Sequence, residues 1–208
     1  MFQRRRRQQL IQGLRTLTKT VESDARAMST WPDHKLRHKT IELQKRHANA
    51  HESLDELLRD AFALVAEASN RVLSRSISTS QLAAACAIHI GGGVELTHED
   101  DEPDLVCVAV AYLRALSGAG VHVIAIDEQT STDDFAKLAA LYSFLGLEAR
   151  DIHEGMNAPT RQLAYASDVT YGPLTEFCSD YMINMLSTPL PHRPIRQRLA
   201  SGFHRNSV

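Results

Sequence analysis

The stretch over residues 91–126 constrains the fold of this chain more than any other. It predicts a short β run that ends near Leu96, a polar loop, a helix that begins at Pro103 and a strand over 121–126. Proline suits the first helical position, because an N–H at that position would have no hydrogen-bond partner within the helix. Gly118 ends the predicted helix. A strand, a loop, a helix and a strand in this order are typical of an α/β domain with a parallel sheet.

The loop before Pro103 is acidic, whereas a phosphate-binding loop at such a place is rich in glycine and carries a lysine. Its carboxylates, together with the one in the first helical turn, are Glu99, Asp100, Asp101, Glu102 and Asp104. These negative charges would repel phosphate. We therefore predict that Asp101 or Asp104 caps the helix and fills the anion site from within.

Length and composition fit a single soluble domain of medium size. The 208 residues are 43% hydrophobic and 23% charged, which is enough apolar material for a core. No apolar run approaches the ~20 residues that span a bilayer, and the N-terminus lacks an apolar signal region. The cysteines Cys86, Cys107 and Cys178 follow no metal-binding spacing, so we predict buried thiols in a reducing cytoplasm.

Charge is distributed unevenly along the chain. Residues 1–50 hold 12 Lys and Arg against 4 Asp and Glu, whereas residues 51–150 hold 6 against 16. The basic end is the natural candidate for contact with anionic lipid, nucleic acid or an acidic partner. Nucleic acid is not expected, because the aromatic residues that stack bases are not interleaved with the arginines.

Residues 1–28 are predicted to form one helix with an apolar stripe and a run of four arginines. We predict that this helix is a membrane-surface or partner-binding arm. Its contact residues would be Arg4, Arg5, Arg6, Arg7, Leu10, Leu14 and Leu17. The alternative for the stripe is that it packs on the chain's own domain while the arginines are solvated.

Two further helices are predicted before residue 75. One runs from Pro32 to about Ala50, and Ser53 with Glu56 forms a capping-box pattern at the start of the next, which is long and amphipathic. Histidines with a spacing of four are His34 with His38 and His47 with His51. Because no third ligand or carboxylate accompanies either pair, we predict no metal site.

A series of motifs runs almost unbroken from about residue 8 to 186. They include Leu36-Arg-His-Lys-Thr40, Glu52-Ser-Leu-Asp-Glu-Leu-Leu58, Gln81-Leu82, Ala111-Tyr-Leu113, Gly120-Val-His-Val123, Phe144-Leu-Gly-Leu147, Asp168-Val-Thr-Tyr-Gly172 and Glu176-Phe177. Together they resemble the amino-terminal DEAD-like motor domain of the SecA family, bacterial ATPases that drive preproteins through the SecY channel.

The resemblance places the family's nucleotide motifs on residues that differ from them. The Gly-Glu-Gly-Lys-Thr loop falls on 100–104, with its lysine on Pro103 and its threonine on Asp104. The adenine-reading glutamine is kept as Gln81, a vestigial cofactor contact, although its place after Ser-Thr-Ser also predicts a helix start. An Asn-Asp-Tyr-Leu-Ala motif has become residues 127–131. The Asp–Glu pair that activates water would follow about where the chain ends.

The family's apolar and glycine positions, in contrast, are retained. They predict strands over 147–152 and 168–171 and a helix over 132–145. A further helix is begun by Asn157 and Pro159. The resemblance implies an α/β fold: a RecA-like parallel sheet flanked by helices, with an N-terminal helical arm. The sheet would be incomplete, and its open edge would need cover from the tail, a partner or a second copy.

We accordingly expect a basic helical arm over 1–50, a SecA DEAD-like domain over 51–186 and a Pro-rich basic tail over 187–208. The predicted function is that of a non-catalytic accessory or regulator of protein export, cytoplasmic and peripherally membrane-associated, with no cofactor. The candidate partners are SecA, the SecY channel, a preprotein, an anionic membrane surface and a second copy of the chain. Alternatives are a residual ATP-binding translocase fragment, a repurposed interaction scaffold and a decaying relic.

Overall fold

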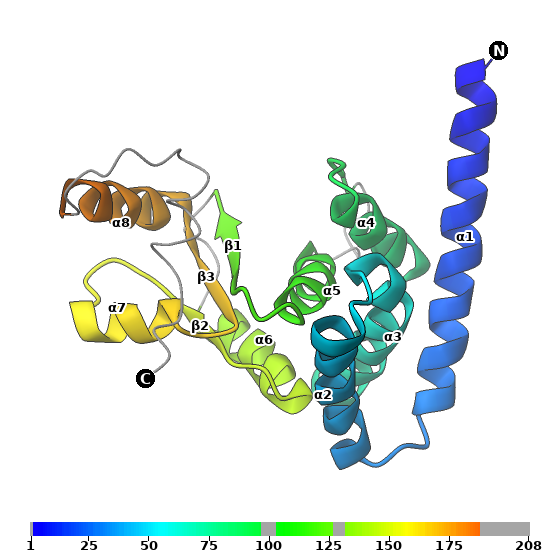
Figure 1. The fold of residues 1–208 in the computed structure, drawn as a ribbon, viewed down its shortest axis with the longest axis horizontal. Helices are drawn as coiled ribbons and strands as arrows, with labels where there is room; N and C mark the ends of the chain where they lie inside the picture. Colours follow the sequence, from blue (N-terminus) through cyan, green and yellow to red (C-terminus); the bar gives the residue numbers. More distant parts are fainter. Residues whose placement is uncertain (1, 97–102, 127–131, 188–208) are drawn as a thin grey trace.

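The computed structural model of the protein describes residues 2–96, 103–126 and 132–187 (Figure 1). The described elements in chain order are α1 (Phe2–Met28), α2 (Asp33–Ala50), α3 (Leu54–Leu73), α4 (Thr79–His89), α5 (Pro103–Ala115), β1 (Val121–Ala125), α6 (Thr132–Leu145), β2 (Ala149–Asp151), α7 (Ala158–Tyr165), β3 (Val169–Pro173) and α8 (Leu174–Ser187). Helices α1 to α5 form one side of the molecule, and the sheet with α7 and α8 forms the other, with α6 between them (Figure 1).

The three described strands form one parallel sheet in the order β1-β3-β2. Val121 of β1 and Ala149 of β2 both lie opposite Val169 of β3. Parallel neighbours need long crossover connections, which α6 and α7 supply here. The α/β class and the parallel sheet that the sequence predicts are therefore confirmed.

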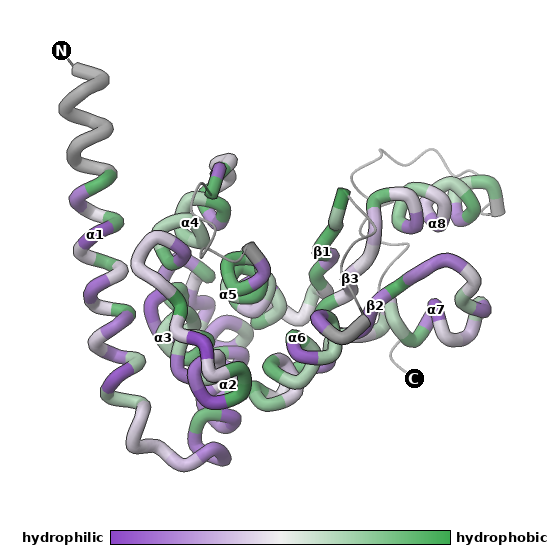
Figure 2. The backbone as a smooth tube through the Cα atoms, turned by 180° about the vertical axis from the view of Figure 1, so that it is seen from behind, coloured by the Kyte–Doolittle hydropathy of each residue, from purple (hydrophilic) through white to green (hydrophobic). Residues whose placement is uncertain are grey.

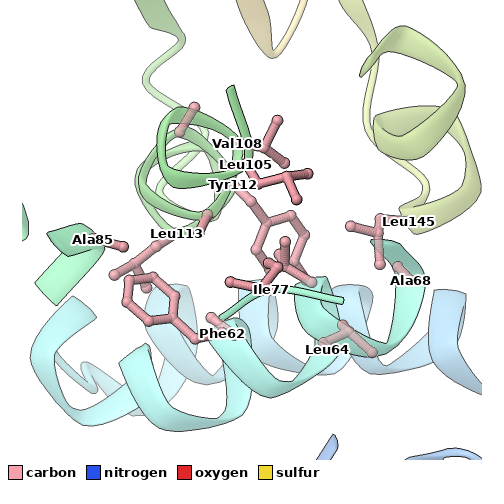
Figure 3. Packing of buried hydrophobic residues seen from close by; sticks show 14 of the residues in the cluster. Phe62, Leu64, Ala68, Ile77, Ala85, Leu105, Val108, Tyr112, Leu113 and Leu145 are labelled. Atoms are coloured by element: carbon pink, nitrogen blue, oxygen red, sulfur yellow. The ribbon is translucent and has the colours of Figure 1, made fainter. Parts of the chain in front are cut away.

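Helix α3 is the centre of the helical side, because it packs against α1, α2, α5 and α6. Its residues 61–65 are all fully buried, so this turn is apolar on every face. Phe62 of α3 lies beside Leu113 of α5 in the core, and Tyr112 of α5 belongs to the same buried cluster (Figure 3). The hydroxyl of the buried Tyr112 is satisfied by Thr40 of α2 at 2.9 Å, as burial of a polar group requires.

Most of the predicted helix ends are confirmed. Ser53 and Glu56 form both hydrogen bonds of the capping box at the start of α3. Asn157 caps α7 by accepting the N–H of Thr160 at 2.9 Å. Pro103 is the first residue of α5. Each of these ends is specified by a local side-chain signal.

Two expectations are wrong. The predicted β run ending near Leu96 is not a strand, since residues 92–96 have no regular structure. Gly91 has a φ of 88°, and three consecutive glycines resist the extended ladder because they lose the most backbone entropy. The thiols are also not uniformly buried: Cys86 is buried, Cys107 is half-buried and Cys178 on α8 is exposed.

Candidate functional site

Ligands of open parallel sheets bind at the carboxyl ends of the strands. Here that edge comprises the ends of β1 and β3 and the amino terminus of α5. Residues 97–102 and 127–131, which carry most of the acidic loop and one altered nucleotide motif, lie outside the described residues. Asp104 lies in the first turn of α5. Capping by Asp101 or Asp104 stays a prediction.

Gln81 lies in the first turn of α4, where it completes a capping box with Ser78. Its side-chain oxygen accepts the N–H of Ser78 at 2.8 Å, and its own N–H donates to the Ser78 hydroxyl at 3.1 Å. The side chain is buried. The helix-start role that the sequence predicts for Gln81 is therefore confirmed, whereas its role as a vestigial adenine contact remains a prediction.

A pair of buried tyrosines joins α6 to the middle of β3. The hydroxyls of Tyr142 on α6 and Tyr171 on β3 are 2.9 Å apart, and the ring of Phe135 lies 5.5 Å from that of Tyr171. Burial raises the pKa of both tyrosines. Burial, with a smaller contribution from the charge of Asp104, also raises the pKa of the Cys107 thiol on α5. These groups stay protonated near neutral pH, so they supply no anionic nucleophile.

A polar network joins α7 to α8 on the other face of the sheet. Arg161 donates to Glu176 at 2.6 Å and to Asp180 at 2.8 Å, and it also donates to the carbonyl of His153. The Tyr165 hydroxyl donates to the same Asp180 oxygen at 2.6 Å. Every acceptor of this network is matched by a donor from α7. The network is built to hold two helices together, and sequence analysis did not single it out.

Sequence analysis also missed a buried histidine contact between helices. The Nε2 atom of His89, at the end of α4, lies 2.6 Å from a carboxylate oxygen of Asp55 in the first turn of α3. A carboxylate at a helix start and an imidazole at a helix end both suit the helix dipoles. Within the described residues, the buried Nδ1 atom of His89 has no hydrogen-bond partner.

The predicted arm is the helix α1, and the structure describes side chains from residue 11 onward. The side chains of Arg4 to Arg7 and of Leu10 thus lie outside the described residues. Leu14 and Leu17 are half-buried and pack against the core, and Val21 and Met28 are fully buried in it. This part of the stripe therefore packs on the chain's own domain. Contact of the stripe with a membrane or partner stays a prediction.

A shallow groove of about 600 Å³ runs between α1 and α3. Its lining residues are Gln12, Gly13, Thr16, Leu17, Thr20 and Arg59. Arg59 is engaged in an ion pair with Asp24 of α1, with Nε 2.5 Å from Oδ2. The groove is therefore mainly neutral, and its one cation is already paired.

The described ranges hold neither a cluster of metal ligands nor a membrane-spanning helix. No group of three potential metal ligands comes together there, and the His47 ring instead contacts the carbonyl of Glu52 at 2.7 Å. None of the described helices combines the length and the apolar character needed to cross a bilayer.

Comparison with known proteins gives a consistent result. A family model described as the SecA DEAD-like domain matches residues 1–199. The chain is 42% identical over 150 residues to protein translocase subunit SecA of Nocardia farcinica (strain IFM 10152), which covers 72% of this chain and 16% of that protein. It is 37% identical over 185 residues to protein translocase subunit SecA of Dichelobacter nodosus (strain VCS1703A), covering 88% of this chain and 20% of that protein. The chain thus spans at most about a fifth of the length of these relatives.

Proposed function

The chain belongs to the SecA family, and we propose that it serves preprotein translocation as a non-catalytic accessory or regulator without a working ATP site. The observation that carries this proposal is the pair Pro103 and Asp104 at the start of α5. They stand where the family's loop has its lysine and its threonine. Without a lysine, and with a carboxylate at the helix start, the position lacks the cationic contact that phosphate needs.

Gln81 supports the same proposal. Its side-chain oxygen and its backbone N–H both serve the capping box with Ser78. An adenine ring would have to compete with these hydrogen bonds for the glutamine. Replacing a made hydrogen bond by another yields little net free energy, so the retained glutamine by itself does not indicate nucleotide binding.

The proposed contact with the export machinery is the helix α1. Its amino-terminal part projects beyond α3 and α4, whereas its later part lies along them (Figure 1). Arg4, Arg5, Arg6, Arg7 and Leu10 belong to the projecting part, and Leu14 and Leu17 keep part of their surface exposed beside it. A basic amphipathic helix of this kind suits an anionic membrane surface. The proposed location is therefore the cytoplasm, in peripheral contact with the membrane.

A pull-down from the native cytoplasm and membranes, scored for SecA, SecY and bound preprotein, tests the proposal. We expect the tagged 208-residue chain to retain at least one of them. A variant with Arg4 to Arg7 replaced by glutamine should retain less than the wild type, and a variant with Arg15 and Lys19 replaced should lose less than the four-arginine variant does. Recovery of none of the three components from either fraction would contradict a role in export.

A further inference from the structure

Helix α2 leaves one of its sides uncovered. Leu36, Thr40 and Leu43 are buried on the side that packs on the domain. Successive helical residues are about 100° apart, so residues two positions away from these three lie on the opposite side. That side is formed by His34, His38, Ile41 and Lys45, all of which are exposed. We call these four residues the outer face of α2.

The carboxylates of α2 do not neutralise this face. Asp33 and Glu42 are the acidic residues of the helix. Asp33 pairs with Arg71 of α3 at 2.7 Å, and Glu42 pairs with Lys39 of α2 itself at 2.7 Å. Both carboxylates are thus already used by cations that do not belong to the outer face.

Three cations of α2 have no carboxylate partner among the described residues. They are Lys45 on the outer face and Lys35 and Arg37 on its two flanks. The Nζ atom of Lys35 lies 3.8 Å from the centre of the Trp31 ring, and Nε of Arg37 donates to the carbonyl of Phe144 at 3.3 Å. A ring face and a carbonyl attract a cation but carry no net charge. The outer face and its flanks therefore hold three positive charges that the domain does not neutralise.

This absence of partners contrasts with other basic side chains of the domain. Ion pairs of 2.8 Å or less are made by Arg46, Arg59, Arg71, Arg150 and Arg161. The exposed Arg15 and Lys19 of α1 resemble the cations of α2, since no carboxylate in the described part of the chain pairs with them. Because they lie on a different helix, they provide a control for the effect of charge alone.

An apolar side chain lies in the middle of the outer face. Ile41 is 44% exposed, with His38 one turn before it and Lys45 one turn after it. Figure 2 shows α2 as largely hydrophilic, with separate hydrophobic segments. Protein interfaces commonly combine an apolar centre with a polar rim. The outer face has this arrangement over about three helical turns.

We propose that the outer face of α2 binds an acidic helical segment of another protein. Such a segment carries carboxylates and apolar side chains three or four residues apart on one side, which is also the spacing within the outer face. Its carboxylates pair with Lys45 and with the flanking Lys35 and Arg37, while one of its apolar side chains packs on Ile41. Complementary charge of this kind guides the encounter and fixes the orientation of the partner.

A lipid surface or a nucleic acid fits this face less well. A helix that lies in a membrane surface needs a broad apolar face, but Leu36 and Leu43 of α2 are buried in the core. A phosphate backbone offers no apolar group to Ile41. The face is also separate from the basic arm, since α2 follows the Met28 end of α1 and Phe2 lies at the opposite end (Figure 1). The inference therefore goes beyond the proposed export function and does not depend on it.

Binding of a synthetic peptide to the purified 208-residue chain tests the proposal. The probe is a helical peptide of about five turns with glutamates at four-residue spacing on both sides of one leucine. The reference peptide has glutamine in place of each glutamate. We expect fluorescence anisotropy to show that the wild type binds the acidic peptide about tenfold more tightly than the reference, or better.

Two matched pairs of variants locate the binding. Lys35→Gln combined with Lys45→Gln should weaken binding of the acidic peptide about fivefold or more, because two ion pairs are lost. Arg15→Gln combined with Lys19→Gln removes the same charge from α1 and should leave the affinity unchanged. Ile41→Ser should also weaken binding, whereas Ile11→Ser, at a position of α1 that is 40% exposed, should not. Circular dichroism should be the same for all of these variants, since each changed residue is exposed.

Carbodiimide coupling gives an independent readout. It joins a glutamate of the bound peptide to a lysine amine as an amide, with loss of one water taken up by the carbodiimide. Mass spectrometry should find the peptide on Lys35 and Lys45 in preference to Lys19.

Three results would overturn the proposal. The first is equal affinity of the wild type for the acidic and the reference peptide. The second is an affinity that the Lys35 and Lys45 variant keeps, or that the Arg15 and Lys19 variant loses to the same extent. The third is absence of peptide binding together with binding to phosphatidylglycerol vesicles or to poly(U) that only the Lys35 and Lys45 variant loses, because the face would then serve a lipid or a nucleic acid.

Discussion

The guanidinium of Arg161 lies 2.8 Å from the carboxylate of Asp180, and this ion pair joins α7 to α8. Both side chains are only 17% exposed. A second carboxylate, Glu176, binds the same guanidinium at 2.6 Å. One cation therefore neutralises two partly desolvated carboxylates. This arrangement holds α7 and α8 together where they cover one face of the sheet.

Replacing Arg161 should consequently destabilise the protein more than loss of a surface ion pair does. Arg161→Met leaves both carboxylates without their cation, and we expect a loss of about 2–3 kcal/mol in the free energy of unfolding. Arg59→Met is the control, because Arg59 forms an equally short ion pair but is 53% exposed. Its loss should cost clearly less, because an exposed ion pair is screened by solvent. Urea denaturation measures both, and equal effects would contradict the argument.

The parts of this fold that sequence analysis predicted are those with local signals. Pro103, the Ser53–Glu56 capping box and Asn157 each mark a helix start through their own backbone or side-chain chemistry. Gln81 belongs to this group as well, since its three-residue spacing from Ser78 is a capping signature. Such signals need no knowledge of the rest of the chain.

The parts that were missed depend on tertiary partners. The run before Leu96 joins three glycines, which disfavour a strand, to Val94 and Leu96, which suit one, and a strand exists only when a neighbour pairs with it. The stripe on α1 was read correctly as apolar, yet periodicity does not say which surface a stripe meets, and Leu14 and Leu17 meet the chain's own core. The Arg161 network joins residues up to 19 positions apart, so no spacing reveals it.

His122 should make stability depend on pH. Its ring lies 4.9 Å from that of Phe177 and 5.6 Å from that of Tyr165. Part of the residue stays exposed, but this packing partly desolvates the ring and lowers its pKa below the ordinary value of 6.5. The folded state therefore binds the proton less readily than the unfolded state does. The contribution of His122 to stability is complete above pH 6.5 and is lost as the pH falls toward the lowered pKa.

His122→Phe keeps an aromatic ring beside Phe177 and removes the titration. We expect the difference in unfolding free energy between pH 8 and pH 5 to be smaller in this variant than in the wild type. His153, for which the described residues show no ring contact with Phe177 or Tyr165, is the control position, where substitution by Phe should leave that difference unchanged. An identical pH dependence in the wild type and in His122→Phe would remove His122 as a cause.

The acidic start of α5 should bind no nucleotide. We expect calorimetry with magnesium and ATP to show no affinity tighter than about millimolar, roughly −4 kcal/mol, and no hydrolysis. The reason is the set of carboxylates over residues 99–104 in place of a glycine-rich, lysine-bearing loop. Micromolar binding of ATP would instead favour the alternative of a residual ATP-binding translocase fragment.

The same acidic segment should stabilise α5 through one capping aspartate. Alanine at whichever of Asp101 and Asp104 caps the helix should cost about 0.5–2 kcal/mol of unfolding free energy. Asparagine at that position should restore most of the loss, because it caps as well as aspartate without the charge. Asp100→Ala is the control and should have little effect. Similar stabilities for all three alanine variants in urea denaturation would exclude a cap from this segment.

The basic arm should bind anionic vesicles. Each basic residue near such a surface contributes about 1 kcal/mol, so Arg4 to Arg7 together supply a few kcal/mol before Leu10 enters the interface. Co-sedimentation should fall steeply with salt, since the attraction is screened beyond about 8–10 Å at physiological ionic strength. Replacing the four arginines by glutamine should abolish most of the binding, whereas replacing Arg15 and Lys19, which are exposed farther along α1, should reduce it less. If neutral vesicles bind as well as anionic ones, or if removal of residues 1–9 leaves co-sedimentation unchanged, α1 serves only as a packed helix of the domain.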